Sequence, residues 1–406
     1  MKVVHITFSS GGGAGSVATD LQKFQISTGI DSEIYCLTSG DIKSVILRRP
    51  FLFFTSLIDY ILVKRSDSKG LFTLFRRGFN FRGKDLSRSG LVLHIHWHSG
   101  LISLSEFLTL CNKSVPMLIT LHDMLPITGG CHFSNGCDNH LSGCEACPQV
   151  RKHFQRHVLN RYQKKTMMYK KNPALGFTTP GPWLLEHLRN SPISSGIRSQ
   201  LIYNPIDSSF FKLGDSKAIR DTLKVPKNAF VIGCCAVNVR DPRKRIDLII
   251  KAWNSIQENN NAKREIWLIV VGGNRLQRNV VKAGRLIKMP LIKSRKELAD
   301  IYSTFDVLCS MSSAETFPNI VHECAAMGVP SILSAIPGHK HAIGNFALGV
   351  DSEEALGEGI LTLESNQDLH RELRLNALKF ARTLDQSIIN EFFLREYKYL
   401  FEISKR

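Results

Sequence analysis

The chain has 406 residues, too many for one ordinary hydrophobic core and about right for two domains of roughly 150 to 200 residues each. Its composition, 43% hydrophobic and 22% charged, is that of a globular protein and excludes global disorder. The formal net charge of +18 requires anionic partners, and three classes satisfy that requirement: nucleic acid, an anionic membrane surface and phosphate-bearing substrates.

The first residues form a short apolar run that stops at Ser9-Ser10-Gly11, without the longer apolar core of a signal peptide. The best candidate for a membrane span, residues 51–63, contains Asp59 and is too short to cross a bilayer. We therefore expect a cytoplasmic protein. Basic and aromatic residues are interleaved from Phe51 to Lys84. This mixture fits either peripheral binding to the inner face of an anionic cytoplasmic membrane or an amphipathic insertion packed on its own domain.

Apolar runs of strand length alternate with helical patterns along the chain, which is typical of parallel sheets covered by helices. We predict two doubly wound α/β domains, residues 1–195 and 205–385, followed by a C-terminal helix over residues 386–406. A stretch rich in Pro and Ser at 192–205 predicts the break between the domains. The expected strands are 3–8, 33–37, 91–96, 117–121 and 175–179 in the first domain and 230–237, 266–271, 307–310 and 331–335 in the second.

A glycine-rich loop follows the first predicted strand and precedes a helical pattern that starts at Val17. Gly12 and Gly13 lie at its centre, where a missing side chain lets a ligand approach the backbone amides of a helix start. The loop departs from a dinucleotide fingerprint because Ser16 occupies the third glycine position. It predicts either a contact to an anionic donor or a tight structural turn.

The most informative stretch is residues 311–330, in which a polar loop after a strand holds Glu315. A helix is predicted from about Pro318 to Met327, where Gly328 stops it, and Glu323 lies one to two turns into this helix. Free amides at such a helix start can bind a diphosphate, while the two carboxylates accept hydrogen bonds from sugar hydroxyls.

This block resembles the retaining glycosyltransferases of family 4, whose hallmark is a Glu-x7-Glu motif followed by a helix that ends in Gly-x-Pro. The resemblance implies the GT-B fold, with two Rossmann-like domains facing across a cleft, the acceptor mainly on the first domain and a nucleotide-sugar donor mainly on the second. It implies that Glu315 contacts the transferred sugar and Glu323 the ribose. Further donor contacts are implied for Thr316, Phe317 and Asn319. His322 and Cys324 depart from the family's usual Leu and Ala.

The resemblance extends to residues 236–248, which are similar to the basic donor-phosphate loop of the same family. Lys244 falls on the lysine that neutralises the donor diphosphate, and this role lowers the barrier to its departure. Either Arg240 or Arg243 supplies the partner arginine. Arg245 stands where the family usually has Gly.

In the first domain, residues 93–97 and 121–132 resemble a family 4 subgroup of bacterial exopolysaccharide enzymes that includes colanic-acid-type transferases. His122 ends a predicted strand and so lies at the ligand-binding edge of an open sheet. The resemblance implies that His122 lies beside the reacting sugar, orienting it and stabilising charge, with Asp123 in support. His96 is interpreted as a structural residue at a strand end.

Four cysteines fall in one short loop, residues 131–147, and the last two form a Cys-x2-Cys pair. Four thiolates can close a tetrahedral structural zinc site, and reduced cysteines without a metal are the alternative. His132 and His140 are possible substitute ligands. The four candidate ligands are Cys131, Cys137, Cys144 and Cys147.

These observations predict an enzyme that transfers a sugar from a nucleotide-sugar donor to a saccharide acceptor, expected to be lipid-linked, in polysaccharide biosynthesis. The resemblance implies retention at the anomeric carbon and no metal or other cofactor for catalysis. Three alternatives stay open: a nucleotide-sugar epimerase or hydrolase on the same fold, a family member without catalysis that acts as a scaffold, and a basic nucleic-acid-binding protein. The last requires a strongly salt-dependent affinity for nucleic acid.

Overall fold

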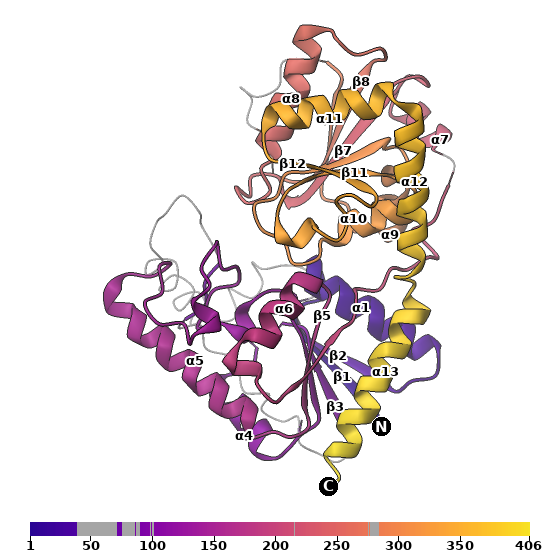
Figure 1. The fold of residues 1–406 in the computed structure, drawn as a ribbon. Coiled ribbons are helices and arrows are strands. Elements are labelled where there is room, and N and C mark those ends of the chain that lie inside the picture. Colours follow the sequence, from indigo (N-terminus) through magenta and orange to yellow (C-terminus); the bar gives the residue numbers. More distant parts are fainter. Residues whose placement is uncertain are drawn as a thin grey trace. The chain divides into compact units, whose positions relative to one another are not determined.

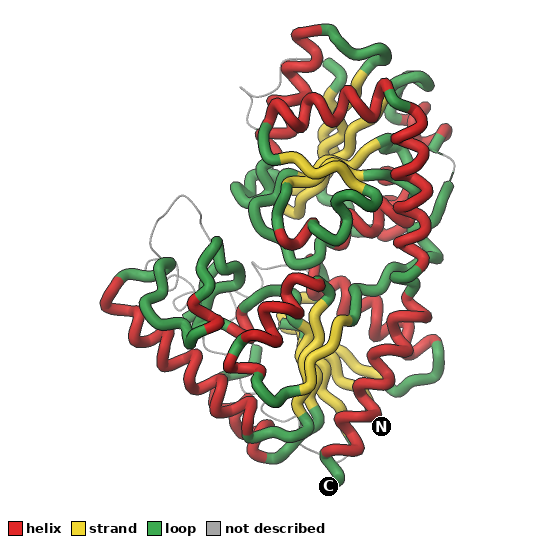
Figure 2. The backbone as a smooth tube through the Cα atoms, in the orientation of Figure 1, coloured by secondary structure: helices red, strands yellow, loops and turns green. Residues whose placement is uncertain are grey.

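The computed structural model describes residues 1–38, 71–74, 86, 90–97, 99, 101–214, 216–274, 276 and 284–406. The chain divides into two compact units. The N-terminal unit comprises residues 1–205 together with 386–406, and the C-terminal unit comprises residues 206–385. Figures 1 and 2 show one sheet with helices on both faces in each unit.

The N-terminal unit is built on a six-stranded parallel sheet in the order β2-β1-β3-β4-β5-β6. Helices α1 and α13 cover one face, and α4, α5 and α6 lie on the other (Figure 1). The elements are β1 (Lys2–Ser9), α1 (Gly12–Ser27), β2 (Ser32–Thr38), β3 (Leu91–Ile95), α4 (Leu104–Asn112), β4 (Met117–Thr120), α5 (Gln155–Lys170), β5 (Leu175–Thr179), α6 (Pro182–Asn190), β6 (Arg198–Leu201) and α13 (Gln386–Ile403).

The C-terminal unit has a second six-stranded parallel sheet, in the order β12-β11-β10-β7-β8-β9. The elements are α7 (Lys217–Thr222), β7 (Phe230–Asn238), α8 (Ile246–Asn259), β8 (Ile266–Gly273), β9 (Leu286–Met289), α9 (Arg295–Tyr302), β10 (Val307–Ser310), α10 (Asn319–Ala326), β11 (Ser331–Ser334), β12 (Ala347–Val350), α11 (Glu353–Ser365) and α12 (Gln367–Arg382).

The strands expected from apolar runs are all present, and three further strands, β6, β9 and β12, were not predicted. Each of the three lies at the edge of its sheet. An edge strand is covered less completely than a central one, and β6 and β9 each contain polar residues that interrupt the apolar run typical of a buried parallel strand. Strand β12 is apolar throughout but only four residues long. Strand β6 reads Arg-Ser-Gln-Leu and falls inside the stretch 192–205 that was interpreted as the break between domains. The N-terminal unit therefore extends to Pro205 before the chain leaves it.

Helix α13 returns the chain to the N-terminal unit, where its apolar side packs against the sheet. Ile389, Phe393, Tyr397 and Leu400 join Val3, Leu21, Val92, Leu118 and Ile202 in one buried cluster. The sequence predicted the helix but not this partner. None of the helices in the described part of the chain is both long and apolar enough to cross a lipid bilayer.

Most of the basic and aromatic segment from Phe51 to Lys84 lies outside the described residues. Within it, Phe72 is described, and this ring is buried in the core of the N-terminal unit. The backbone of Phe72 forms an isolated antiparallel bridge with Cys131. Phe72 therefore packs on its own domain and is not available to a membrane surface, contrary to its inclusion in the membrane-binding interpretation.

Candidate active site

The strand order of the C-terminal unit places a topological switch point between β7 and β10. Successive strands run from β7 through β8 to β9 on one side, and from β10 through β11 to β12 on the other. In open parallel sheets, ligands bind outside the carboxyl ends of the strands at this point. The loop after β7 carries Arg243 and Lys244, and the loop after β10 carries Glu315.

These two loops meet through charged side chains. The Nζ atom of Lys244 lies 2.5 Å from the Oε1 atom of Glu315. Arg243 donates to the carbonyl oxygen of Ala314 at 3.0 Å and lies 3.4 Å from the same carboxylate oxygen. Burial acts to raise the pKa of Glu315, but the charges of Lys244 and Arg243 outweigh it and the pKa is lowered overall. Glu315 is therefore an ionised hydrogen-bond acceptor at neutral pH.

Backbone contacts fix the geometry of these loops. The Oδ1 atom of Asp241 accepts from the amide of Arg243 at 2.9 Å, and the amide of Ser313 donates to the carbonyl of Arg243 at 2.8 Å. Arg245 has a φ of 48°, in the left-handed region that favours glycine, immediately before α8 begins. This conformation explains why a glycine would be suited to this position.

Of the two arginines proposed as partners of Lys244, Arg243 is the one that contacts Glu315. Arg240 is exposed, and its amide bonds to the side chain of Asn238 at 2.9 Å. The structure therefore brings Arg243, Lys244 and Glu315 together in one cluster.

Glu323 lies in α10, buried except for 8% of its surface. Its Oε1 atom accepts from the guanidinium of Arg295 at 2.6 Å, and Arg295 also lies over the ring of Phe211, 5.5 Å from its centre. Arg295 is the first residue of α9, after an N-cap in which the Ser294 side chain accepts from the amide of Glu297. The sequence reasoning missed Arg295, because no local pattern links it to α10.

Three residues between Glu315 and Glu323 were also expected to contact the donor, and they differ in how far they are buried. Phe317 is buried and stacks on the imidazole of His322, with ring centres 3.7 Å apart. Thr316 is buried beside it, and Asn319 opens α10 at the sheet edge, half-buried. The Phe317 side chain is thus packed in the interior, so a donor contact from this residue would come from its backbone.

In the N-terminal unit, helix α1 begins at Gly12, five residues before the predicted start at Val17. Gly12 and Gly13 are exposed, and a side chain at either position would meet open space. Gly15 is different, because an added Cβ would lie 2.1 Å from the carbonyl oxygen of Ser9. Part of this glycine pattern therefore serves the close packing of α1 on the end of β1, and Gly12 and Gly13 are the ones that leave the backbone accessible.

His122 follows β4 at the same edge of the N-terminal sheet and is half-buried. Burial lowers its pKa to about 4, with the charge of Asp123 acting in the opposite direction. His122 is therefore neutral at physiological pH. Asp123 does not hold His122: its Oδ1 accepts from the amide of Leu125 at 2.8 Å, and its Oδ2 lies 2.5 Å from the Nδ1 of His132.

The cysteine loop is folded against the N-terminal core. Its four cysteines surround one small cavity together with Phe72, Gly129 and His140. The amide of Gly129 donates to the Sγ of Cys144 at 3.2 Å. Among the described residues, two groups of three side chains have metal-binding atoms within 4.8 Å of one another: His5 with His94 and His96, and Asp138 with His140 and His187. Neither group includes a cysteine, so the four thiols are more widely spaced than the ligands of one ion would be. His132 is not available as a ligand, because its ring nitrogens bond to Asp123 and Thr73.

Residues 215–380 match the family described as glycosyl transferases group 1. This range contains Lys244, Arg295, Glu315 and Glu323. The C-terminal unit is a group 1 glycosyltransferase domain. The chain is also 26% identical over 342 residues to WcaC of Escherichia coli K12, assigned as a colanic acid biosynthesis glycosyl transferase, with 79% of this chain and 80% of WcaC covered.

Solved structures match nearly the whole chain, including both units. Sucrose-phosphate synthase from Thermosynechococcus elongatus superposes with a TM-score of 0.67 at 17% identity, covering 99% of each chain. HepE of Anabaena in complex with UDP superposes with a TM-score of 0.63 at 15% identity, covering 97% of this chain and 99% of HepE. The prediction of the GT-B fold with two parallel-sheet α/β domains is therefore confirmed.

Proposed function

We propose that the protein transfers a sugar from a nucleotide-sugar donor to a saccharide acceptor in polysaccharide biosynthesis, with retention of anomeric configuration. The observation that carries this proposal is the position of Glu315, Lys244 and Arg243 at the β7/β10 switch point of the glycosyltransferase domain. Two solved structures of HepE, a protein with the same fold, support a nucleotide donor, since HepE was crystallised with UDP and with UDP-glucose.

Each side chain in this cluster has a role that its charge suits. Lys244 and Arg243 neutralise the diphosphate as it leaves, and their positive charge replaces that of a metal ion. The amides at the start of α10 add partial positive charge for the same group. Glu315 accepts hydrogen bonds from hydroxyls of the transferred sugar, and Glu323, held by Arg295, accepts from the ribose. No metal or cofactor takes part in this chemistry.

The first test is a thermal-shift screen of the whole chain against UDP, GDP, ADP, CMP and dTDP, because a ligand that binds only the folded state raises its stability. We expect one nucleotide to stabilise the protein, and the Glu323→Ala variant to lose most of the shift. Stabilisation by duplex or single-stranded nucleic acid instead would contradict the proposal.

Product analysis with the matching nucleotide sugar then separates the reaction classes. A transferase forms a new glycosidic bond only when an acceptor saccharide is added, whereas a hydrolase releases free sugar and an epimerase releases an altered sugar without one. The anomeric configuration of the new bond, read by NMR, tests retention directly. Turnover that is independent of acceptor would favour the hydrolase or epimerase.

The acceptor is proposed to be lipid-linked, with the segment from Phe51 to Lys84 binding the anionic inner face of the membrane. Flotation with vesicles containing anionic lipid tests this at low and high salt, with neutral phosphatidylcholine vesicles as the control. We expect flotation only with anionic vesicles at low salt. Protein that stays at the bottom in every case would contradict the membrane proposal and leave the transfer reaction unaffected.

We also propose that Cys131, Cys137, Cys144 and Cys147 hold a structural zinc ion, for which the thiols must move closer together around their shared cavity. Elemental analysis of the purified chain should give about one zinc per molecule. The double substitution Cys144→Ser with Cys147→Ser should remove it, and Cys36→Ser, at an exposed cysteine, should not. Four reactive thiols in a zinc-free protein would show that the loop folds without metal.

A further inference from the structure

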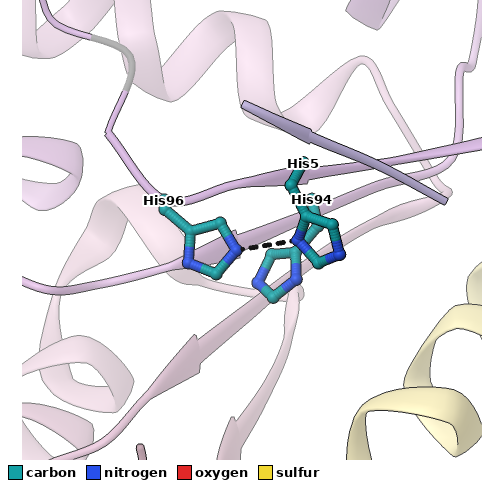
Figure 3. A group of neighbouring side chains, drawn as sticks. All are labelled: His5, His94 and His96. Carbon is teal, nitrogen blue, oxygen red and sulfur yellow. Dashed lines mark hydrogen bonds between the residues drawn. The ribbon is translucent and has the colours of Figure 1, made fainter. Parts of the chain in front are cut away.

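One face of the N-terminal sheet carries a group of buried histidines that the reaction outlined above does not use (Figure 3). His5 in β1 is the cross-strand partner of His94 in β3, so their side chains lie on the same face. His96 follows two residues after His94 and therefore joins them on this face. His122 stands in the same relation to Thr120, the end of β4. Helices α1 and α13 cover this face.

Hydrogen bonds connect three of these histidines in series. The Nε2 atom of His5 lies 2.9 Å from the Oε1 of Gln25 in α1, and its Nδ1 lies 3.0 Å from the Nε2 of His96 (Figure 3). The Nδ1 of His96 lies in turn 3.0 Å from the Nε2 of His122. The series thus runs from the buried interior between α1 and the sheet to the edge where ligands bind.

Gln25 determines which nitrogen donates and which accepts in each hydrogen bond of the series. Its amide nitrogen donates to the Oδ1 of Asn390 in α13 at 3.2 Å, and its Oε1 also accepts from the hydroxyl of Ser32 at 2.9 Å. An amide oxygen can only accept, so the proton of neutral His5 must be on Nε2. The Nδ1 of His5 then accepts from the Nε2–H of His96, and the Nδ1 of His96 accepts from the Nε2–H of His122.

This arrangement leaves the Nδ1 of His122 without a proton, and that atom has no hydrogen-bond partner among the described residues. Burial lowers the pKa of His5 to about 4 and that of His96 well below its usual value, in each case as the largest effect. The rings therefore stay neutral at physiological pH, and the direction set by Gln25 is retained. A neutral ring contributes a lone pair at the sheet edge and no positive charge.

A metal ion is a different occupant to consider, because donor atoms of His5, His94 and His96 lie within 4.8 Å of one another. All of their ring nitrogens already have partners, however. Those of His94 bond to the hydroxyl of Tyr397 at 2.6 Å and to that of Thr120 at 2.7 Å. A metal would have to break these bonds in a fully buried site, so the hydrogen-bonded series accounts better for the geometry.

We propose that Gln25, His5 and His96 are positioning residues that fix His122 in its Nε2–H tautomer, so that its bare Nδ1 accepts a hydrogen bond from a sugar hydroxyl. The tautomer itself follows from the hydrogen-bond series alone. The sugar hydroxyl as its ligand rests on the proposed function. This proposal keeps the orienting role expected for His122 and assigns it to a neutral acceptor, in place of the stabilisation of charge that was also expected.

The tautomer can be read by long-range proton–nitrogen correlation spectra of the full chain labelled with ¹⁵N in its histidine rings, at pH 7.5. We expect His122, assigned by its loss in His122→Gln, to show a protonated Nε2 and an unprotonated Nδ1. Gln25→Met removes the acceptor and should give a mixture of both tautomers. Gln22→Met, on the same helix but outside the series, should leave the spectrum unchanged.

Gln25→Glu separates a positioning role from a merely structural one, because a carboxylate is also an acceptor and should restore the Nε2–H tautomer of His122. If transfer activity is found, we expect kcat to fall about tenfold in Gln25→Met, with the KM for the nucleotide sugar changed less than twofold, and to recover in Gln25→Glu. Thermal melting of each variant separates these effects from unfolding.

The positioning role of Gln25, His5 and His96 and the proposed sugar transfer can fail separately. An Nδ1–H tautomer in the wild type, or an Nε2–H tautomer that persists in Gln25→Met, would overturn the positioning role even in an active transferase. An Nε2–H tautomer that responds to Gln25 as expected, in a protein that transfers no sugar, would overturn the proposed function and leave the series intact.

Discussion

The two units share one architecture, a six-stranded parallel sheet with a switch point, but they place opposite kinds of chemistry at the sheet edge. In the C-terminal unit, Lys244 and Arg243 each place a charged nitrogen within 3.4 Å of the Oε1 atom of Glu315. In the N-terminal unit, neutral imidazoles and hydroxyls bond to one another beneath His122. Charge suits a diphosphate, which must be neutralised as it leaves, whereas neutral acceptors and donors suit hydroxyls. The same scaffold therefore accommodates either solution, and the side chains at the strand ends decide between them.

The strongest way to break the comparison is to remove the charge from the C-terminal edge. Lys244→Met should lower kcat/KM for transfer by roughly 10²- to 10³-fold, because the proposed diphosphate leaving group loses a cation that would neutralise it. The measurement is initial-rate kinetics with the nucleotide sugar identified in the thermal-shift screen.

Arg245→Gly is the matched control for that variant. It removes the adjacent exposed cation at a position whose φ of 48° suits glycine, so transfer should be unchanged. A Lys244→Met enzyme with more than a third of the wild-type kcat/KM would show that the cluster has no catalytic role.

The second prediction tests the neutrality of the N-terminal histidines. The pKa values of His5 and His122 in the folded state are about 4, below the value of about 6.5 expected in the unfolded chain. The unfolded chain therefore binds more protons between these values, and stability that is fully present above pH 6.5 is lost as the pH falls toward 4. Each histidine should cost about 2 kcal/mol of unfolding free energy by pH 5.

Denaturant unfolding at pH 7.5 and pH 5.0 measures this loss. His5→Gln should reduce the difference between the two pH values, while His153→Gln, at an exposed histidine, should not change it. Equal pH dependence in His5→Gln and the wild type would mean that His5 is not held neutral by the fold.

A third prediction sharpens the description of the charged edge. Glu323→Gln should raise the dissociation constant for the bound nucleotide about tenfold, or about 1.4 kcal/mol, because an amide replaces the carboxylate that Arg295 orients. Isothermal titration calorimetry gives the constant. Glu297→Gln, an exposed acid two residues after Arg295, serves as the control and should bind with wild-type affinity.

The smallest expected effect concerns the hydrogen bonds beneath the neutral edge. Tyr397→Phe removes the hydroxyl that lies 2.6 Å from the Nδ1 of His94 and should destabilise the protein by about 1 kcal/mol. Tyr399→Phe, on the same helix but exposed, should cost nothing measurable. Equal melting temperatures for the two variants would show that the His94 contact adds no net stability.

The sequence predicts the parts of this molecule that are encoded locally. Central strands such as 175–179 show as apolar runs, and Glu315, Glu323 and Lys244 stand in motifs of adjacent residues. The edge strands β6 and β9 lack such runs because fewer neighbours cover them, and β12 was missed because its apolar run is only four residues long.

Contacts across long sequence distances were not accessible in the same way. Arg295 reaches Glu323 across 28 residues, and Gln25 reaches Asn390 across 365. One available signal, the spacing of the histidines, was overlooked. His94 and His96 are two residues apart, so their side chains lie on the same face of the sheet, and His5 in the neighbouring strand β1 lies on that face as well. Period-two alternation identifies such a face but not the helix that covers it.

The division of the N-terminal unit between residues 1–205 and 386–406 has a consequence for the order of events on the ribosome. All of residues 206–385 are synthesised before α13, so the C-terminal unit can fold while the N-terminal sheet still lacks one of its covering helices. During that interval Val3, Val92, Leu118 and the histidine face are open on the side that α13 later covers. A nascent chain in this condition exposes apolar surface that chaperones bind. A premature stop codon before Gln386 would therefore damage the first-made unit rather than the last.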